Sequence, residues 1–131
     1  MTKQTPSLDQ WLEEAKQDEK ADQCGMYLFH NGVVRETAKK QVREKQEGLP
    51  PVTSLYFDYD QEKVDAAIAS ALQLPGIKYV RVWLNQGELN VGDDIMFVLI
   101  GGDIRPNIID GLQSLVGEIK NNCVEEIEKY D

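Results

Sequence analysis

The sequence predicts a single α+β domain over residues 1–131, with a largely antiparallel sheet and helices packed on one face. A chain of 131 residues, 41% of them hydrophobic, is long enough to bury a core of its own. Segments with helical and strand periodicity follow in the order helix, strand, strand, helix, strand, strand, helix. Two strand pairs, each accompanied by a helix, are typical of antiparallel sheets covered by helices.

The first part of the chain predicts a helix, a strand and a loop. Ser7 begins the helix, because its hydroxyl can accept a hydrogen bond from the Gln10 amide, and the polar run 16–23 ends it. Residues 26–34 are rich in aromatic and β-branched side chains, which favour a strand. The segment at about 36–53 is polar and highly charged. We expect a long mobile loop there, because loops of this length are usually functional or disordered.

A strand, a helix and a second strand are expected next. Apolar and polar side chains alternate over residues 55–59, which indicates a half-buried strand. Asp60 then caps an amphipathic helix that ends at Pro75 and Gly76. Alternation returns over residues 80–84 and predicts another strand.

The last part of the chain predicts a central strand and a long helix. After a turn region marked by Gly87 and Gly92, residues 95–100 are apolar at every position, so this strand should be buried on both faces. Pro106 is a favoured first-turn residue of a helix. The expected buried stripe of that helix consists of Ile108, Ile109, Leu112, Leu115, Val116 and Ile119. Cys123 and Ile127 continue the stripe, and one hypothesis is that the helix runs on through them.

Composition excludes several classes of function. The net charge of −9 argues against non-specific nucleic-acid binding, which requires clustered basic residues. The longest apolar run, 95–100, is too short for a membrane span, and the N-terminus has no apolar signal region, so a cytoplasmic location is expected. Cys24 and Cys123 are expected to be free thiols. One histidine without a Cys/His cluster predicts no metal site, and no cofactor is expected.

Residues 87–105 carry the most specific pattern, a Gly-x-Leu-x-x-Gly-Asp turn, an apolar strand and a lone arginine. This pattern resembles the large, catalytic subunit of molybdopterin synthase. The family then continues with a long helix that has a lysine near its end. The matching positions are Gly87, Leu89, Gly92, Asp93, the strand 95–100, Arg105 and Lys120. Residues 25–35 also resemble a family strand that ends in Gly-x-x-Arg, which matches Arg35.

The resemblance implies a role in molybdenum cofactor biosynthesis. In the family, the large subunit is a homodimer that accepts the Gly-Gly tail of a ubiquitin-like small subunit. The terminal thiocarboxylate of that tail donates sulfur to cyclic pyranopterin monophosphate. The implied partners of this chain are therefore a second copy, a small subunit and an anionic pterin, and the implied fold is that of the large subunit.

The resemblance also implies roles for individual residues. Arg35 and Arg105 match substrate-binding positions, and arginine forks suit phosphate and carboxylate groups. Lys120 matches a catalytic lysine that stabilises negative charge or shuttles protons. Each has an alternative: Arg35 as a surface residue, Arg105 as a helix-terminal residue, and Lys120 as a cation favoured by the helix dipole.

A basic segment adds further candidates for substrate binding. Lys39 and Lys40 lie in a stretch, 35–47, with a local excess of positive charge that would attract an anion. The alternative is an ordinary solvated loop or helix face. The single histidine, His30, is expected to pack or hydrogen-bond within its strand, because it aligns with no catalytic histidine.

Two departures from the family pattern leave the activity open. Ile104 stands where the family has histidine, and Ile127 stands where the second catalytic lysine belongs. Lys129 is two places late for that role and is the remaining candidate for it. One hypothesis is a divergent enzyme that uses Lys120 and Lys129. The other is a non-catalytic relative that acts as a dimeric binding or regulatory module, and an unrelated α+β domain is the third alternative.

Overall fold

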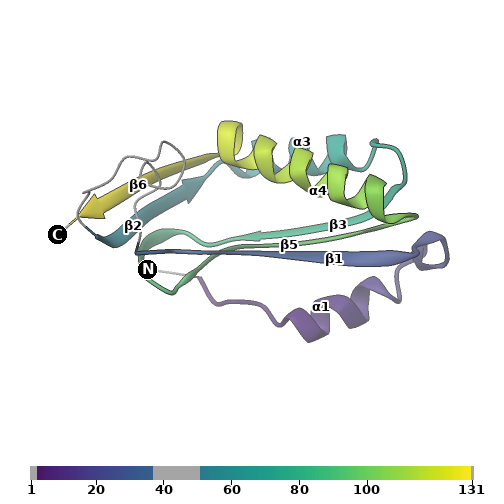
Figure 1. Ribbon diagram of the computed structural model, residues 1–131, viewed down its shortest axis with the longest axis horizontal. Helices are drawn as coiled ribbons and strands as arrows, with labels where there is room; N and C mark the ends of the chain where they lie inside the picture. Colours follow the sequence, from purple (N-terminus) through teal and green to yellow (C-terminus); the bar gives the residue numbers. More distant parts are fainter. Residues whose placement is uncertain (1–2, 37–50, 131) are drawn as a thin grey trace.

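The computed structural model describes residues 3–36 and 51–130, which form two antiparallel sheets and the helices that cover them (Figure 1). The large sheet has the strand order β1-β5-β3, and the small sheet has the order β4-β2-β6. The large sheet contains β1 (Met26–Val33), β5 (Asp94–Gly102) and β3 (Ile77–Leu84). The small sheet contains β4 (Gly87–Asn90), β2 (Val52–Tyr59) and β6 (Val124–Tyr130). The helices are α1 (Leu8–Ala15), η1 (Ala21–Gln23), α3 (Gln61–Ala71), α4 (Arg105–Glu118) and η2 (Ile119–Cys123).

Strand β5 is the centre of the molecule, as its unbroken apolar run predicts. All residues from Ile95 to Gly102 are buried, and β1 and β3 pair with β5 on its two sides. Met96 and Val98 belong to the core under α3 and α4, whereas Phe97 and Leu99 pack with Trp11 of α1. Alternate side chains of β5 therefore anchor two different layers.

The predicted α+β class is confirmed, and the structure adds a helix on the second face. Helices α3 and α4 lie on one face of the large sheet, while α1 lies on the other (Figure 1). Trp11 contacts Phe97 edge to face, with ring centroids 6.0 Å apart. A central strand that is apolar on both faces needs cover on both, which explains the placement of α1.

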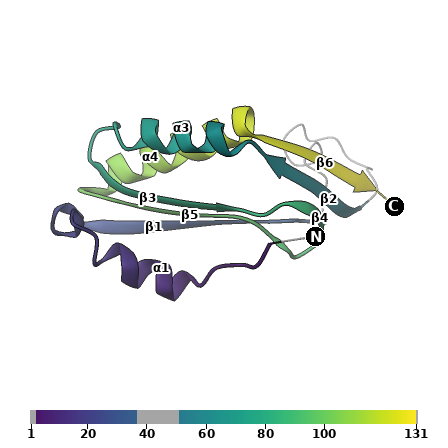
Figure 2. The same cartoon turned by 180° about the vertical axis from the view of Figure 1, so that it is seen from behind.

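The small sheet contains two strands that the sequence did not predict. Residues 87–90, expected within a turn region, form β4 and pair with β2 (Figure 2). Residues 124–130 form β6 on the other side of β2, so the hypothesis of a helix continuing to Ile127 is wrong. Cys123 is buried as that hypothesis required, but Ile127 is 48% exposed. The extended backbone of Val124 ends the helical conformation after η2.

The predicted N-terminal caps of α1 and α3 are present. The Gln10 amide donates to Ser7 Oγ over 3.2 Å, and Asp60 accepts from Glu62 and Lys63. Both cysteines are free. Of the segment expected to be a mobile loop, residues 37–50 lie outside the described residues, and residues 52–53 belong to β2.

The described residues offer neither a membrane-spanning helix nor a metal-binding cluster. No helix there has the length and apolar character that a membrane crossing requires. No group of three or more His, Cys, Asp and Glu side chains in that part of the chain is placed to hold a metal ion.

Candidate functional site

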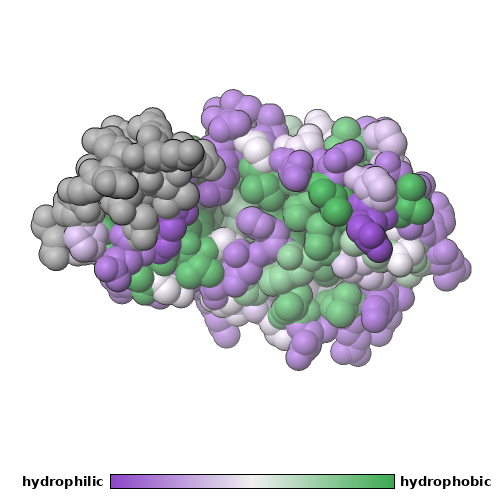
Figure 3. Space-filling model, in the orientation of Figure 1, coloured by the Kyte–Doolittle hydropathy of each residue, from purple (hydrophilic) through white to green (hydrophobic). Residues whose placement is uncertain are grey.

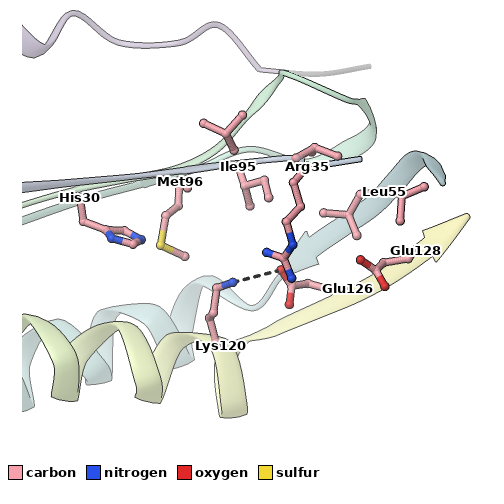
Figure 4. Close-up of a pocket in the computed structure, with 12 residues that line it drawn as sticks. His30, Arg35, Leu55, Ile95, Met96, Lys120, Glu126 and Glu128 are labelled. Atoms are coloured by element: carbon pink, nitrogen blue, oxygen red, sulfur yellow. Dashed lines mark ion pairs between the residues drawn. The ribbon is translucent and has the colours of Figure 1, made fainter. Parts of the chain in front are cut away.

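A cavity of about 220 Å³ lies where the large sheet meets β6 and η2 (Figure 4). One side is apolar and is formed by β1, β2 and β5, through Val34, Leu55, Ile95 and Met96 among others. The polar side chains that line it are His30, Arg35, Lys120, Glu126 and Glu128. An apolar pocket with a few convergent polar groups is the usual form of a small-molecule site.

The cavity brings together two of the predicted site residues. Arg35 follows β1, and Lys120 lies in η2, directly after α4. Both side chains extend into the space between the large sheet and β6 (Figure 4). The Lys120 side chain is 27% exposed, so its ammonium group is partly shielded from water. Two cations beside an apolar wall suit a ligand with an anionic group and a flat or apolar body.

Strand β6 contributes carboxylates on the opposite side of the cavity. Glu126 Oε1 lies 3.7 Å from Lys120 Nζ, with only 15% of the glutamate side chain exposed. Because side chains alternate along a strand, Glu126 and Glu128 face the cavity while Ile127 and Lys129 face away. Figure 4 shows the Arg35 guanidinium pointing toward Glu126 as well. The cavity therefore holds two cations and two carboxylates.

Lys129 does not line the cavity. Its Nζ lies 2.8 Å from Glu88 Oε1 on β4, and both side chains are about half exposed. This contact holds the pKa of Glu88 below its ordinary value, mainly through the hydrogen bond from Lys129. Within one chain, the second cation that the enzyme hypothesis sought near Lys120 is therefore not Lys129.

Arg105 lies far from Arg35 and Lys120 in the single chain. It opens α4, whereas Lys120 follows the end of that 14-residue helix, which is about 20 Å long at the usual rise per residue. Ile104 precedes it and is 58% exposed. The resemblance implies that Arg35 and Arg105 share a substrate site, and in one chain the two arginines do not lie near one another. Lys39 and Lys40 lie outside the described residues.

His30 was expected to pack or hydrogen-bond within its strand, and the structure places it in the lining of the cavity. Its Nε2 atom is buried and has no hydrogen-bond partner among the described residues. Burial lowers the pKa of His30 below its ordinary value of 6.5, and the positive charge of Lys120 lowers it further. Alternation along β1 could have revealed this position, since Leu28 on the same face packs in the core under α4.

Glu126 and Glu128 were also missed as pocket residues. Their position depends on β6, and the charged sequence of that strand gives little strand signal of its own. The alternation is visible only after the strand is known. The spacing of these glutamates from Lys120 in the sequence does not show which face of β6 their side chains occupy.

Solved structures share this fold. Molybdopterin synthase from Staphylococcus aureus is 15% identical, with a TM-score of 0.73 over 96% of this chain and 86% of that one. A MoaE protein from Burkholderia ambifaria MC40-6 is 14% identical, with a TM-score of 0.71 over 98% and 82%. A protein-protein complex of subunits 1 and 2 of molybdopterin-converting factor from Helicobacter pylori 26695 contains a chain 16% identical, with a TM-score of 0.62 over 95% and 80%. These similarities define the chain as a domain of the molybdopterin synthase large-subunit fold.

The family follows from the sequence itself. The model of the family described as MoaE protein matches residues 1–122, and the chain belongs to that family. The predicted resemblance and the role in molybdenum cofactor biosynthesis are thereby confirmed, and the hypothesis of an unrelated domain is wrong. A comparison with curated proteins finds no match. The family match ends at Asn122, so β6 with its three glutamates, two of which line the cavity, lies beyond the matched residues.

Proposed function

We propose that this chain is a molybdopterin synthase large subunit that transfers sulfur from a small-subunit thiocarboxylate to cyclic pyranopterin monophosphate. The observation that carries the proposal is the convergence of Arg35 and Lys120 in one cavity, from opposite ends of the chain. Arg35 offers a planar fork for the phosphate. Lys120, which lines the same cavity, would stabilise developing negative charge or move a proton beside the reacting carbon.

The proposed partner is a ubiquitin-like small subunit with a C-terminal Gly-Gly. The Helicobacter pylori structure with the same fold is a complex of subunits 1 and 2 of molybdopterin-converting factor, which supports such a partner here. The cavity opens between the large sheet and β6, and an extended tail could enter it there. We place the protein in the cytoplasm with the rest of this biosynthesis.

We further propose that the protein works as a homodimer. Apolar surface lies over α4 on the face shown in Figure 3, and Ile104 and Ile109 at the start of that helix are exposed. An exposed apolar patch of this kind favours association. In a dimer, Arg105 of one copy could reach the cavity of the other copy. Within one chain, the length of α4 separates Arg105 from Lys120.

Reconstitution tests the activity. The purified protein is mixed with a thiocarboxylated small subunit and cyclic pyranopterin monophosphate, and molybdopterin is measured. Conversion by the unmodified protein and its loss in Lys120→Ala are expected. Conversion that survives in Lys120→Ala would remove the catalytic role of this lysine, and no conversion by the unmodified protein would refute the enzyme proposal.

The carboxylates favour a second candidate function, a non-catalytic dimeric binding or regulatory module. Glu126 neutralises Lys120 at 3.7 Å, and Glu128 adds another negative charge beside a site meant for anions. A module of this kind would bind the small subunit without converting the pterin. Isothermal titration calorimetry measures binding of the small subunit, and reconstitution measures conversion of the pterin. Binding without conversion supports the non-catalytic module rather than the enzyme.

A further inference from the structure

The proposed roles of Arg35 and Lys120 do not involve His30, another polar residue of the cavity. His30 is the single histidine of the chain, and it lies on β1 opposite Val98 of β5. Its Nε2 atom is buried without a partner among residues 3–36 and 51–130. A buried polar atom without a hydrogen bond is unfavourable, so such an atom in a binding cavity points to a ligand that would satisfy it.

Apolar side chains line the cavity near His30. Met96 and Ile95 from β5 line the cavity next to it. Gly32, two residues along the same face of β1, leaves space beside the ring, because a Cβ added there would lie 3.9 Å from His30 Nε2 and 3.4 Å from Met96 Cγ. Nε2 therefore lies on a buried and apolar part of the cavity lining, beside Gly32 and Met96, and such a lining suits the face of a planar ring.

The surroundings also fix the charge that His30 carries. Burial and the nearby ammonium group of Lys120 both lower its pKa, so the ring is neutral near pH 7. A neutral imidazole has one nitrogen that donates and one that accepts a hydrogen bond, and it does not attract phosphate by charge. Arg35 and Lys120 are the cations for the anionic part of a ligand. His30 is equipped for an uncharged polar part.

We propose that His30 is a specificity-determining residue that hydrogen-bonds through Nε2 to the polar edge of a pterin ring, while Arg35 holds the phosphate. The ring would lie against Met96 and Ile95, beside Gly32. This inference rests on the proposed function, since it names how the same cavity would recognise the heterocycle of that substrate.

A single histidine allows a direct test by NMR. With ¹⁵N-histidine in the protein, both ring nitrogen signals belong to His30 without further assignment. Two probes are added separately: a pterin without phosphate, 6-hydroxymethylpterin, and inorganic phosphate. The pterin is expected to shift the Nε2 signal, and phosphate is expected to leave it nearly unchanged. No shift with the pterin, or an equal shift with phosphate, would overturn the proposal.

Two substitutions test the hydrogen bond apart from the shape of the site. His30→Phe keeps a planar ring but removes the polar atom, and His30→Gln keeps an amide group near the position of Nε2. We expect His30→Phe to weaken pterin binding about tenfold and His30→Gln to restore most of it, in line with the loss of one hydrogen bond. Thermal melting of both variants reports folding. Equal binding by His30→Phe and the unmodified protein would refute the role.

The outcomes separate this inference from the proposed function. If reconstitution gives no molybdopterin but the pterin still shifts His30, the enzyme proposal fails and the binding role stands. If reconstitution succeeds while His30→Phe keeps the KM for the pterin substrate and the NMR signal does not respond, the inference fails alone.

Discussion

The two sides of the cavity differ in how they are built. The side formed by β1 and β5 rests on the most buried strand of the molecule and lies within the residues that match the family. The side formed by β6 is an edge strand with exposed Ile127 and Tyr130, and it follows the end of that match. The two cations of the cavity, Arg35 and Lys120, thus lie within the residues that match the family, whereas the two carboxylates of the cavity lie beyond them.

The largest expected effect separates the two lysines near this boundary. Lys120→Ala should lower sulfur transfer by about 10² to 10⁴-fold, the usual contribution of a positioned acid or base. Lys129→Ala removes the same charge from the outer face of β6, where it contacts Glu88, and should leave the rate close to that of the unmodified protein. Reconstitution kinetics on both variants provides the measurement. A large loss in Lys129→Ala alone would reverse the assignment.

A truncated side chain should cost more stability on the β5 side of the cavity than on the β6 side. Met96 is fully buried on β5, so Met96→Ala is expected to lower the free energy of unfolding by about 2 to 5 kcal/mol. Ile127 is 48% exposed on β6, and Ile127→Ala should change it by about 0.5 kcal/mol or less. Urea titration of the two variants measures both values. Equal losses would show that β6 is as integral to the fold as β5.

Removing a carboxylate should strengthen the binding of anions. Glu126→Gln or Glu128→Gln is expected to raise the affinity for a phosphate-bearing pterin about three- to tenfold, because a unit charge several ångströms away contributes about 1 kcal/mol in a solvated site. Glu125→Gln makes the same change at an exposed position outside the cavity and serves as the matched control. Titration calorimetry at low salt compares the three variants. An equal gain in the control would mean that the net charge of the protein, not the site, sets the affinity.

The smallest expected effect is a pH dependence from the β1 side. The pKa of His30 is lower in the folded protein than in the unfolded chain, so below pH 6.5 the unfolded state takes up more protons at this residue. The contribution of His30 to stability is therefore complete above pH 6.5 and falls as the pH decreases toward its folded pKa. His30→Gln lacks this pH-dependent contribution to stability, because glutamine does not titrate. The difference in unfolding free energy between the two proteins should shift in favour of the variant between pH 7 and pH 5, and a constant difference would contradict the burial of His30.

The sequence predicted the parts of the fold that local pattern determines. The caps at Ser7 and Asp60 and the doubly buried strand 95–100 follow from side-chain chemistry and periodicity, and all three are present. Strands β4 and β6 were missed because each forms by pairing with β2, which lies far from them in sequence. A charged segment such as 124–130 becomes a strand through these non-local hydrogen bonds.

Only part of the candidate site could be predicted from the sequence. Arg35 and Lys120 were found through a family pattern and share the cavity, whereas their relation to Arg105 depends on the length of α4 and on a second copy of the chain. His30 and the two glutamates were missed because their orientation is set by strand register. Register requires knowledge of the partner strand, which a single sequence does not supply.

The five-residue π-helical turn η2 makes the charge of the cavity sensitive to a single insertion or deletion. A π-helical turn accommodates one residue more than an α-helical turn in the same space, and a one-residue shift turns every side chain of the following strand to the other face. Loss of one residue from Ile119–Cys123 would thus direct Ile127 and Lys129 inward and Glu126 and Glu128 toward solvent. Deletion of one residue would thus replace a cavity with paired charges by a cavity with three cations, while the strands that form its apolar side stay unchanged.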